Sequence, residues 1–462
     1  MTEVIDATEL ATLIRRREVS PVEALAEHRR RIELLNPELN AIVTGAPDAD
    51  ERARAAEAAV ARGDELGPLH GVPFTVKDTF DTAGLRTTRG SRLFADRIPQ
   101  RDATVVTRMR GAGAILVGKT NTPEFALWWE TANLVFGRTS NPHDPTRTSG
   151  GSSGGEAVAL ATGMSSLGIG SDLGGSIRLP AHYCGVVGLK PTHGRVPLTG
   201  HFPDTLFRFM HAGALARSVR DAALALAVLE GPDGEDWYVG PSPARPSPHD
   251  EAPLRVGWIS EPAFAPVEPE IARAVSRAAD GLAAAGAIVE QAEPKGFVDV
   301  DTNALTLQLY GAESGAYFAE IVGERREDLH ASLRRRLELP LCTLDEYVAA
   351  EAAVERLRRD LASFFRCYDV LLCPTAPVVA PQHDAEEILV AGVAYPPRTA
   401  MRATIPFDLT GSPALTVPFA RSGEGLPIGV QFVGRRFEDE TVLRAATLVE
   451  PAARTTPSPL PS

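Results

Sequence analysis

The sequence predicts an α/β fold, in which helices pack against a largely parallel or mixed sheet. Segments with helical periodicity alternate along the chain with short apolar segments that are typical of buried strands. The chain has 462 residues, 44% of them hydrophobic and 23% charged, which is ordinary for a globular protein that buries a sizeable core. Strand-like segments occur in both halves of the chain, so both halves are able to contribute to one sheet.

The predicted elements begin with Ser20-Pro21-Val22-Glu23, a capping box that has proline at the first helical position. It predicts a helix that runs to about Leu35. Helical periodicity predicts further helices over residues 48–62, 104–111, 156–162 and 218–229. Short apolar runs predict strands over residues 71–78, 114–120, 254–260, 370–373, 414–418 and 428–433.

A segment rich in proline and glycine, residues 231–253, is predicted to be a surface connection. The segment is consistent with a boundary between two domains and, since strand-like segments lie on both sides of it, equally with both halves contributing to one sheet. The C-terminal residues 451–462 are expected to be disordered.

The charge balance argues against a nucleic-acid partner. The chain has 47 basic and 60 acidic residues, a net charge of −13. Its short basic runs, 15–17 and 334–336, are expected to be solvated helix faces. The first residues have neither the basic nor the apolar segment of a secretory signal, so none is expected, and no apolar run approaches the roughly 20 residues that span a bilayer. We therefore expect a cytoplasmic protein with no membrane partner; whether it forms a homodimer is left open.

Two motifs suggest other enzyme classes but stand in the wrong context. Residues 113–120 match the phosphate-loop pattern G-x4-G-K-T, yet the four intervening residues are Ala-Ile-Leu-Val, which favour a strand over a loop. Residues 150–154 match the G-x-S-x-G elbow, but no apolar strand precedes them, so an α/β-hydrolase stays a minor alternative. The four cysteines lack CxxC spacing and no HExxH occurs, so no metal or cofactor is expected.

Two glycine-rich segments, residues 148–155 and 170–176, place serines in an environment suited to acyl transfer. They are called the first and the second glycine-rich bed. A serine alcohol needs a base, and the base can be a neutral lysine. Lys77 ends an apolar run, so burial is expected to lower its pKa; a salt bridge with Asp78 fits the sequence equally well. His182 and His193 flank the second bed, where packing roles are favoured over a role as base. The run 173–176 is small enough to let a carbonyl oxygen approach its N–H groups.

Residues 150–196, GGSSGGEAVALATGMSSLGIGSDLGGSIRLPAHYCGVVGLKPTHGRV, resemble the amidase signature family. The segments GVPFTVKD, GKTNTPEFA, FDLTGSPALTVP and GLPIGVQFVGRRFEDETVL extend the resemblance over most of the chain. It implies a single domain over residues 1–450, with the family's signature core over residues 70–220, built on one large, mixed, twisted sheet flanked on both sides by helices. It also implies a catalytic triad of Lys77 as base, Ser152 as bridge after a cis peptide bond, and Ser176 as nucleophile.

The resemblance assigns further roles around Ser176. It implies an oxyanion hole made by the backbone N–H groups of Leu173, Gly174, Gly175 and Ser176. Supporting residues would be Ser153, Asp172 and Arg178. Ser171 departs from the family pattern, where threonine is usual, but it keeps a hydroxyl.

The expected function is hydrolysis of small, largely apolar amides through an acyl-enzyme, with water as second substrate and with esters, anilides and carbamates as further substrates. Two alternatives are the A subunit of an aminoacyl-tRNA amidotransferase and a non-catalytic binding protein. The region 199–218 is where family members differ in substrate. An apolar substrate pocket is expected from six residues, which are Trp128, Trp129, Leu206, Phe207, Phe209 and Met210.

Overall fold

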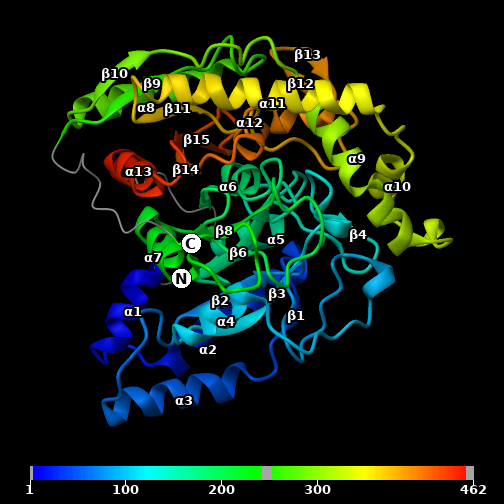
Figure 1. Ribbon diagram of the computed structural model, residues 1–462. Coiled ribbons are helices and arrows are strands. Elements are labelled where there is room, and N and C mark those ends of the chain that lie inside the picture. Colours follow the sequence, from blue (N-terminus) through cyan, green and yellow to red (C-terminus); the bar gives the residue numbers. More distant parts are fainter. Residues whose placement is uncertain (1–3, 242–251, 454–462) are drawn as a thin grey trace.

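A mixed sheet of eleven strands forms the centre of the computed structural model, which describes residues 4–241 and 252–453 (Figure 1). In spatial order its strands are β1 (Ile42–Gly45), β3 (Ile115–Thr120), β2 (Pro73–Lys77), β6 (Leu167–Asp172), β8 (His211–Ala216), β7 (Val187–Lys190), β14 (Ala414–Arg421), β15 (Pro427–Gly434), β11 (Val370–Pro374), β9 (Arg255–Trp258) and β10 (Ile288–Gln291). β2 pairs in parallel with β3 and β6, and β9 does so with β10 and β11. The other neighbouring pairs are antiparallel.

Helices cover both faces of this sheet. On one face α5 (Gly154–Ala161) and α6 (Arg178–Cys184) contact each other and pack on strands such as β6 and β14. The other face carries α7 (Val219–Leu229), α8 (Pro269–Ala284) and α13 (Asp439–Ala453). The predicted α/β class with one large mixed sheet between helical layers is therefore confirmed.

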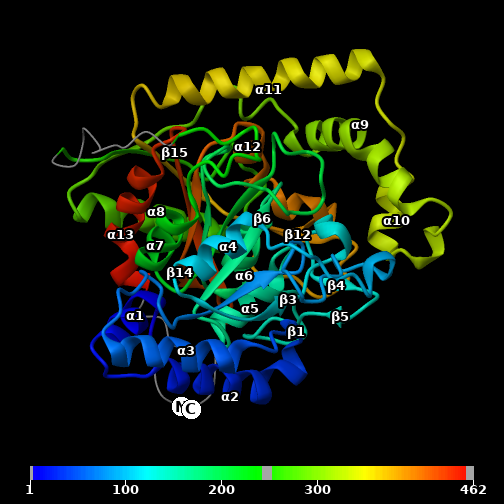
Figure 2. The ribbon, with the colours of Figure 1, turned by 60° about the horizontal axis from the view of Figure 1, so that its bottom comes forward.

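Two further groups of helices lie at the ends of the molecule. At the bottom of Figure 2 are α1 (Ala7–Arg15), α2 (Pro21–Leu39) and α3 (Ala49–Arg62), and α4 (Thr104–Gly111) packs on α7. At the top of Figure 1, α11 (Leu344–Phe364) lies across α9 (Thr302–Val322). The remaining short elements are α10 (Ala331–Leu337), α12 (Ile405–Leu409), β4 (Ala132–Asn133), β5 (Gly137–Arg138), β12 (Ile388–Val390), β13 (Val393–Tyr395), η1 (Arg92–Phe94), η2 (Glu124–Ala126), η3 (Arg326–Asp328) and η4 (Pro397–Met401).

The capping box at Ser20 is formed by reciprocal hydrogen bonds with Glu23, as predicted. The helix continues beyond the expected end, however, and passes through Pro37 to Leu39. Pro37 falls in the last turn, where the loss of one backbone N–H removes little of the helical hydrogen bonding. The Asn36 side chain then accepts the N–H groups of Ala41 and Ile42, both at 2.8 Å, and so secures the exit of the chain.

Strands from both sides of the proline-rich segment 231–253 lie in the one sheet. Residues 242–251 of that segment lie outside the described residues. The helix α13 reaches Ala453 and so overlaps the first three residues of the tail 451–462 that is expected to be disordered; the rest of that tail lies outside the described residues. The limits of the domain, 1–450, and of its core, 70–220, stay a prediction.

The sequence resembling a phosphate loop is part of β3, as expected from its apolar residues. Lys119 is fully buried there. Its ammonium group donates to the carbonyl oxygen of Phe80 and, at 3.0 Å, to the hydroxyl of Thr82. The lysine is therefore engaged by the protein and does not present a free cation to a nucleotide.

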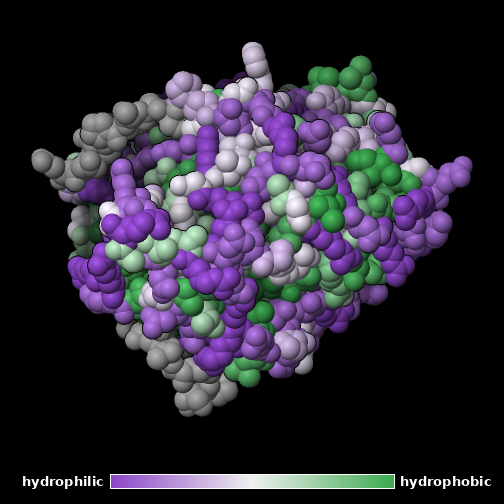
Figure 3. Space-filling view, turned by 90° about the horizontal axis from the view of Figure 1, so that it is seen from below, coloured by the Kyte–Doolittle hydropathy of each residue, from purple (hydrophilic) through white to green (hydrophobic). Residues whose placement is uncertain are grey.

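The surface seen from below is mainly hydrophilic, with small apolar areas spread over it (Figure 3). Within the described ranges, the helices are too short or too polar to cross a membrane. The arginine run 15–17 is exposed, as expected. The run 334–336 differs, because Arg336 is partly buried.

Close packing of α5 against β1 and β3 gives a first prediction. A Cβ atom at Gly155 would lie 2.5 Å from the backbone nitrogen of Asn121 and 2.8 Å from the carbonyl oxygen of Ala41. Gly155→Ala is expected to lower the free energy of unfolding by about 1–3 kcal/mol, measured by urea denaturation. The control Gly111→Ala has open space around the new methyl group and should leave stability unchanged or raise it by less than about 1 kcal/mol. Equal effects of the two substitutions would contradict this packing.

Candidate active site

Lys77, the last residue of β2, meets two serine hydroxyls at the carboxyl end of the strand. Its ammonium nitrogen lies 2.6 Å from Oγ of Ser152 and 3.1 Å from Oγ of Ser171. Lys77 is fully buried and Ser152 is 1% exposed. The alternative salt bridge with Asp78 is not formed, since that carboxylate faces Lys119 at 3.9 Å and accepts two hydrogen bonds from Thr88.

The protonation state of Lys77 is set mainly by its burial. Burial lowers the pKa of Lys77 to about 7, although the charges of Asp172 and Glu156 oppose this shift. Glu156 is itself buried, and this raises its pKa to about 8 despite hydrogen bonds from Thr75 at 2.5 Å and Thr120 at 2.7 Å. A neutral Glu156 removes a charge that would hold a proton on Lys77, so an uncharged amine is accessible near pH 7.

The two glycine-rich beds meet at the serines. The peptide bond between Gly151 and Ser152 is cis. A Cβ atom at Gly151 would lie 2.8 Å from the carbonyl carbon of Trp129, so only glycine permits this close approach. The N–H of Ser153 donates to the carbonyl oxygen of Ser176 at 3.1 Å, which joins the first bed to the second. Ser176 is 7% exposed, so it lies nearer the solvent than Lys77 or Ser152.

A buried ion cluster holds the loop that carries Ser176. The carboxylate of Asp172 accepts the N–H groups of Gly175 at 2.6 Å and Ile177 at 3.0 Å. Arg178 donates to both Asp172, at 2.9 Å, and Asp408, at 2.7 Å, and all three side chains are fully buried. Burial alone would raise the pKa of Asp172, but the charge and hydrogen bonds of Arg178 hold it well below its usual value.

The backbone of this loop turns its carbonyl groups toward the protein. Tyr310 donates its hydroxyl to the carbonyl oxygen of Leu173 at 2.8 Å, and Thr404 donates to that of Gly174 at 2.7 Å. Within the described ranges, the N–H groups of Leu173, Gly174 and Ser176 have no protein acceptor. This leaves donors that are suited to a developing oxyanion.

Gly175 was expected to donate to the oxyanion, and the structure gives its N–H another acceptor. Its N–H already donates to Asp172, so it is not free to bind an oxyanion. Its φ of +124° and a would-be Cβ 2.3 Å from Oγ1 of Thr404 explain why glycine stands there. Gly175 therefore shapes the loop, while its neighbours present the free donors.

The expected apolar pocket of six residues stays a prediction, since the structure shows these side chains mainly as parts of the hydrophobic core. Leu206, Phe209 and Met210 are buried in the main hydrophobic core, and the ring of Phe209 packs on that of Tyr310 at 5.2 Å. Phe207 is packed against the same core. Trp128 and Trp129, which belong to or pack against the same core, also line a cavity of about 590 Å³ together with residues of α9, α10 and η4. The aromatic residues near 206–210 are hydrophobic enough to be core, and their sequence pattern does not distinguish core from pocket.

Several contributing residues were not predicted from the sequence, among them Glu156, Tyr310, Thr404 and Asp408. Of these, Asp408 lies in the quoted segment FDLTGSPALTVP, and Glu156 follows the first glycine bed. His182 bonds to the backbone of Gly429 and Val378, and His193 to that of Phe207, so both have packing roles.

The chain belongs to the amidase family, whose model matches residues 23–443. It is 37% identical to the A subunit of the glutamyl-tRNA(Gln) amidotransferase of Moorella thermoacetica, an alignment that covers 96% of each chain. It is 35% identical to the indoleacetamide hydrolase of Bradyrhizobium diazoefficiens, over 96% of this chain and 86% of that one.

Solved structures give the same class. One, described as revealing the evolutionary origins of an s-triazine catabolic enzyme, is 32% identical with a TM-score of 0.89, over 97% of this chain and 98% of that one. A 6-aminohexanoate cyclic dimer hydrolase with bound substrate is 30% identical with a TM-score of 0.86, over 98% of each chain. The recognition of the amidase signature family is thereby confirmed.

The buried cluster around Arg178 gives a stability prediction. Arg178→Met leaves Asp172 and Asp408 buried without a cation between them, and it should lower the free energy of unfolding by about 3–5 kcal/mol at pH 7. Without Arg178, burial raises the folded-state pKa of Asp172, as it already does for Asp408, so protonation restores stability and the deficit should narrow as the pH falls from 7 to 5.

Urea denaturation at several pH values measures this deficit. The control Arg52→Met removes an exposed pair with Asp48 and should leave the unfolding midpoint unchanged. A deficit for Arg178→Met that is absent, or that widens toward acid, would show that the cluster does not stabilise the loop in this way.

Proposed function

We propose that the protein cleaves a carboxamide through an acyl-enzyme on Ser176, with Lys77 as the base and Ser152 as the relay between them. The observation that carries the proposal is the buried amine of Lys77 at 2.6 Å from the Ser152 hydroxyl, with a pKa of about 7. An amine that is neutral near physiological pH accepts a proton, which is what a serine nucleophile requires.

In this mechanism Ser176 attacks the carbonyl carbon as its proton passes to Ser152, whose own proton passes to Lys77. The free N–H groups of the 173–176 loop stabilise the oxyanion. The C–N bond breaks as the relay returns the proton to the leaving nitrogen, and an ester to Ser176 remains. Water, deprotonated through the same relay, attacks this ester and releases the carboxylic acid.

This chemistry fits two kinds of protein, the A subunit of an amidotransferase and a free-standing amidase. The sequence favours the free-standing amidase, whereas the curated relatives favour the A subunit. Relatives from several bacteria carry that name. In that setting other subunits and a tRNA would be partners, in spite of the acidic net charge.

A second candidate, hydrolysis of small amides with a largely apolar acyl group, is supported by the surroundings of the loop. The Cβ position of Gly174 is 3.5 Å from a side-chain carbon of Ile405 and 3.7 Å from the sulfur of Met401. Esters, anilides and carbamates share the acyl chemistry and belong to this proposal as further substrates. A cytoplasmic location stays a prediction.

One substrate panel tests both the identity of the nucleophile and the choice between an amidotransferase subunit and a free-standing amidase. Ser176→Ala should abolish release of amine or ammonia from every amide, since no acyl-enzyme forms, while circular dichroism remains that of the wild type. The panel contains glutamine, indoleacetamide, aliphatic amides, p-nitroanilides, esters and aryl carbamates. Retained turnover in Ser176→Ala would place the nucleophile elsewhere. Glutamine cleavage together with co-purified subunits selects the amidotransferase, and cleavage of apolar amides by the chain alone selects the amidase.

The pKa of Lys77 sets the expected pH dependence. Its neutral form predominates above about pH 7, so kcat/KM should rise with pH through about 7 and then level off. Lys77→Ala should lose most activity at neutral pH, by about 100-fold or more, and recover some of it at alkaline pH, where hydroxide replaces the base. A flat wild-type profile between pH 5 and 9, measured on an uncharged amide, would contradict the relay.

A further inference from the structure

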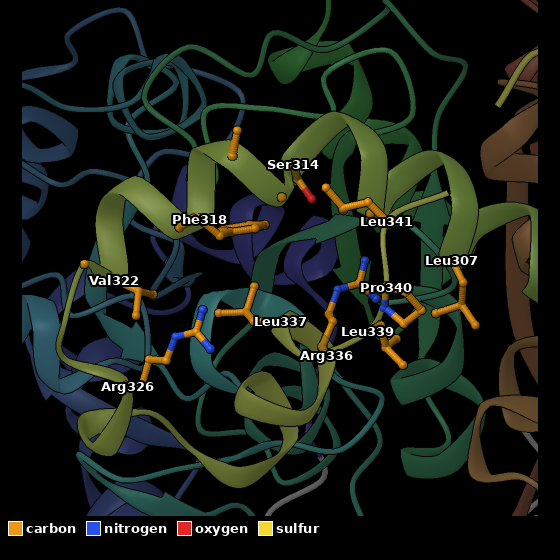
Figure 4. A pocket seen from close by; sticks show the side chains of 15 residues that line it. Leu307, Ser314, Phe318, Val322, Arg326, Arg336, Leu337, Leu339, Pro340 and Leu341 are labelled. Carbon is orange, nitrogen blue, oxygen red and sulfur yellow. The ribbon is translucent and has the colours of Figure 1, made fainter. Parts of the chain in front are cut away.

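Tyr310 of α9 contacts the loop that carries the nucleophile, and it lines neither of two cavities beside that helix. A cavity of about 290 Å³ lies between α9 and α10, and Ser314 and Phe318 of α9 line it (Figure 4). Tyr310 is not part of this lining, nor of that of the 590 Å³ cavity. Tyr310 is 4% exposed, and its ring packs on that of Phe209. The phenol therefore belongs to the packed interior, and its hydroxyl acts on the loop and not on a ligand in either cavity.

The hydroxyl of Tyr310 fixes the direction of one peptide group in that loop. It donates to the carbonyl oxygen of Leu173 at 2.8 Å, and burial raises the pKa of Tyr310 well above its usual value, so the phenol keeps its proton. The peptide bond between Leu173 and Gly174 is trans, and the C=O and N–H groups of a trans peptide point in opposite directions. The N–H of Gly174 is thus turned away from Tyr310, and within the described ranges it has no protein acceptor.

The two peptide groups that follow are fixed by other contacts. Thr404 donates to the carbonyl oxygen of Gly174 at 2.7 Å, and the N–H of the same peptide group, that of Gly175, already has an acceptor within the loop. The carbonyl oxygen of Gly175 accepts the N–H of Leu179 in α6 at 2.7 Å, which turns the N–H of Ser176 the opposite way. The direction of the Ser176 N–H is therefore set by the backbone of α6, whereas that of the Gly174 N–H is set by a side-chain hydroxyl.

The peptide group between Leu173 and Gly174 depends on this contact. In the part of the chain that the structure describes, the Tyr310 hydroxyl is the only donor to the Leu173 carbonyl oxygen. A buried carbonyl group that loses its donor is unfavourable, so without the hydroxyl the peptide group would rotate toward another donor. That rotation carries the Gly174 N–H with it, because the C=O and N–H groups share one rigid plane. Loss of one hydroxyl thus misdirects an N–H group on the far side of the loop.

We propose that Tyr310 is a positioning residue of the oxyanion hole, whose hydroxyl keeps the Gly174 N–H directed at the oxygen that becomes negative when Ser176 attacks a carbonyl carbon. The inference rests on the proposed function, because this oxyanion forms only if Ser176 is the nucleophile. Gly174 and Ser176 then supply two donors whose directions are fixed independently. Preorganised N–H groups of this kind stabilise the transition state more than the bound substrate, so Tyr310 acts on kcat.

Tyr310→Phe removes the hydroxyl and keeps the ring, so it tests this role. With an amide that the wild type cleaves, kcat should fall about 10- to 100-fold while KM changes by less than about threefold. The midpoint of the pH profile should stay that of the wild type, because no contact of Lys77 is altered. The control Tyr317→Phe, on the same helix, removes a hydroxyl that accepts the N–H of Asp204 at 2.9 Å, and it should keep the wild-type kcat. Urea denaturation checks that both variants are folded under the assay conditions.

A general loosening of the loop gives a different result from the loss of one directed donor. It would raise KM or shift the pH midpoint as kcat falls, and either change in Tyr310→Phe overturns the inference while amide cleavage stands. A wild-type kcat in Tyr310→Phe, or an equal fall in Tyr317→Phe, overturns it as well. A lower kcat confined to Tyr310→Phe, at unchanged KM and pH midpoint, supports it.

An irreversible probe separates this inference from the proposed function, because it needs no known substrate. With an alkyl fluorophosphonate, the Ser176 oxygen bonds to phosphorus, fluoride leaves, and the hydroxyl proton passes through Ser152 to Lys77, while the phosphoryl oxygen takes the place of the oxyanion. The labelling rate should fall about tenfold or more in Tyr310→Phe, stay unchanged in Tyr317→Phe and vanish in Ser176→Ala. Equal rates in the wild type and Tyr310→Phe overturn the inference alone. A wild type that is neither labelled at Ser176 nor active on any amide overturns the proposed function.

Discussion

Desolvation of one amino group is the constraint on which the rest of the site depends. Lys77 is buried without an acidic partner in contact, and burial brings its pKa to about 7. An adjacent ionised carboxylate would hold the ammonium form and remove its capacity to act as a base. Asp78 is the next residue along the chain, yet successive side chains of an extended segment point to opposite sides, and Asp78 meets Lys119 instead.

The carboxylate whose charge most strongly opposes a neutral Lys77 is that of Asp172. Its oxygens accept hydrogen bonds from other groups. Arg178 donates to it through two nitrogens, and the N–H groups of Gly175 and Ile177 take its remaining acceptor positions. The same contacts fix the curvature of the loop around Ser176. One buried ion cluster therefore both limits the field at Lys77 and positions the nucleophile segment.

Much of the site could be predicted from the sequence because its key residues lie at the ends of recognisable strands or in glycine-rich beds. Lys77 ends a run of apolar residues, and glycines next to the serines indicate close backbone approach. The class of fold could be predicted for the same reason. The strands β6 and β8 were not predicted, since their several glycine and alanine residues give no clear alternation.

What could not be predicted depends on contacts between segments distant in the sequence. Tyr310 and Thr404 reach the 173–176 loop from elements more than a hundred residues away. The arginine run 334–336 has the sequence pattern of a fully solvated helix face. Successive residues of a helix differ by about 100° in direction, however, and this rotation turns Arg336 toward the interior while Arg334 and Arg335 stay exposed.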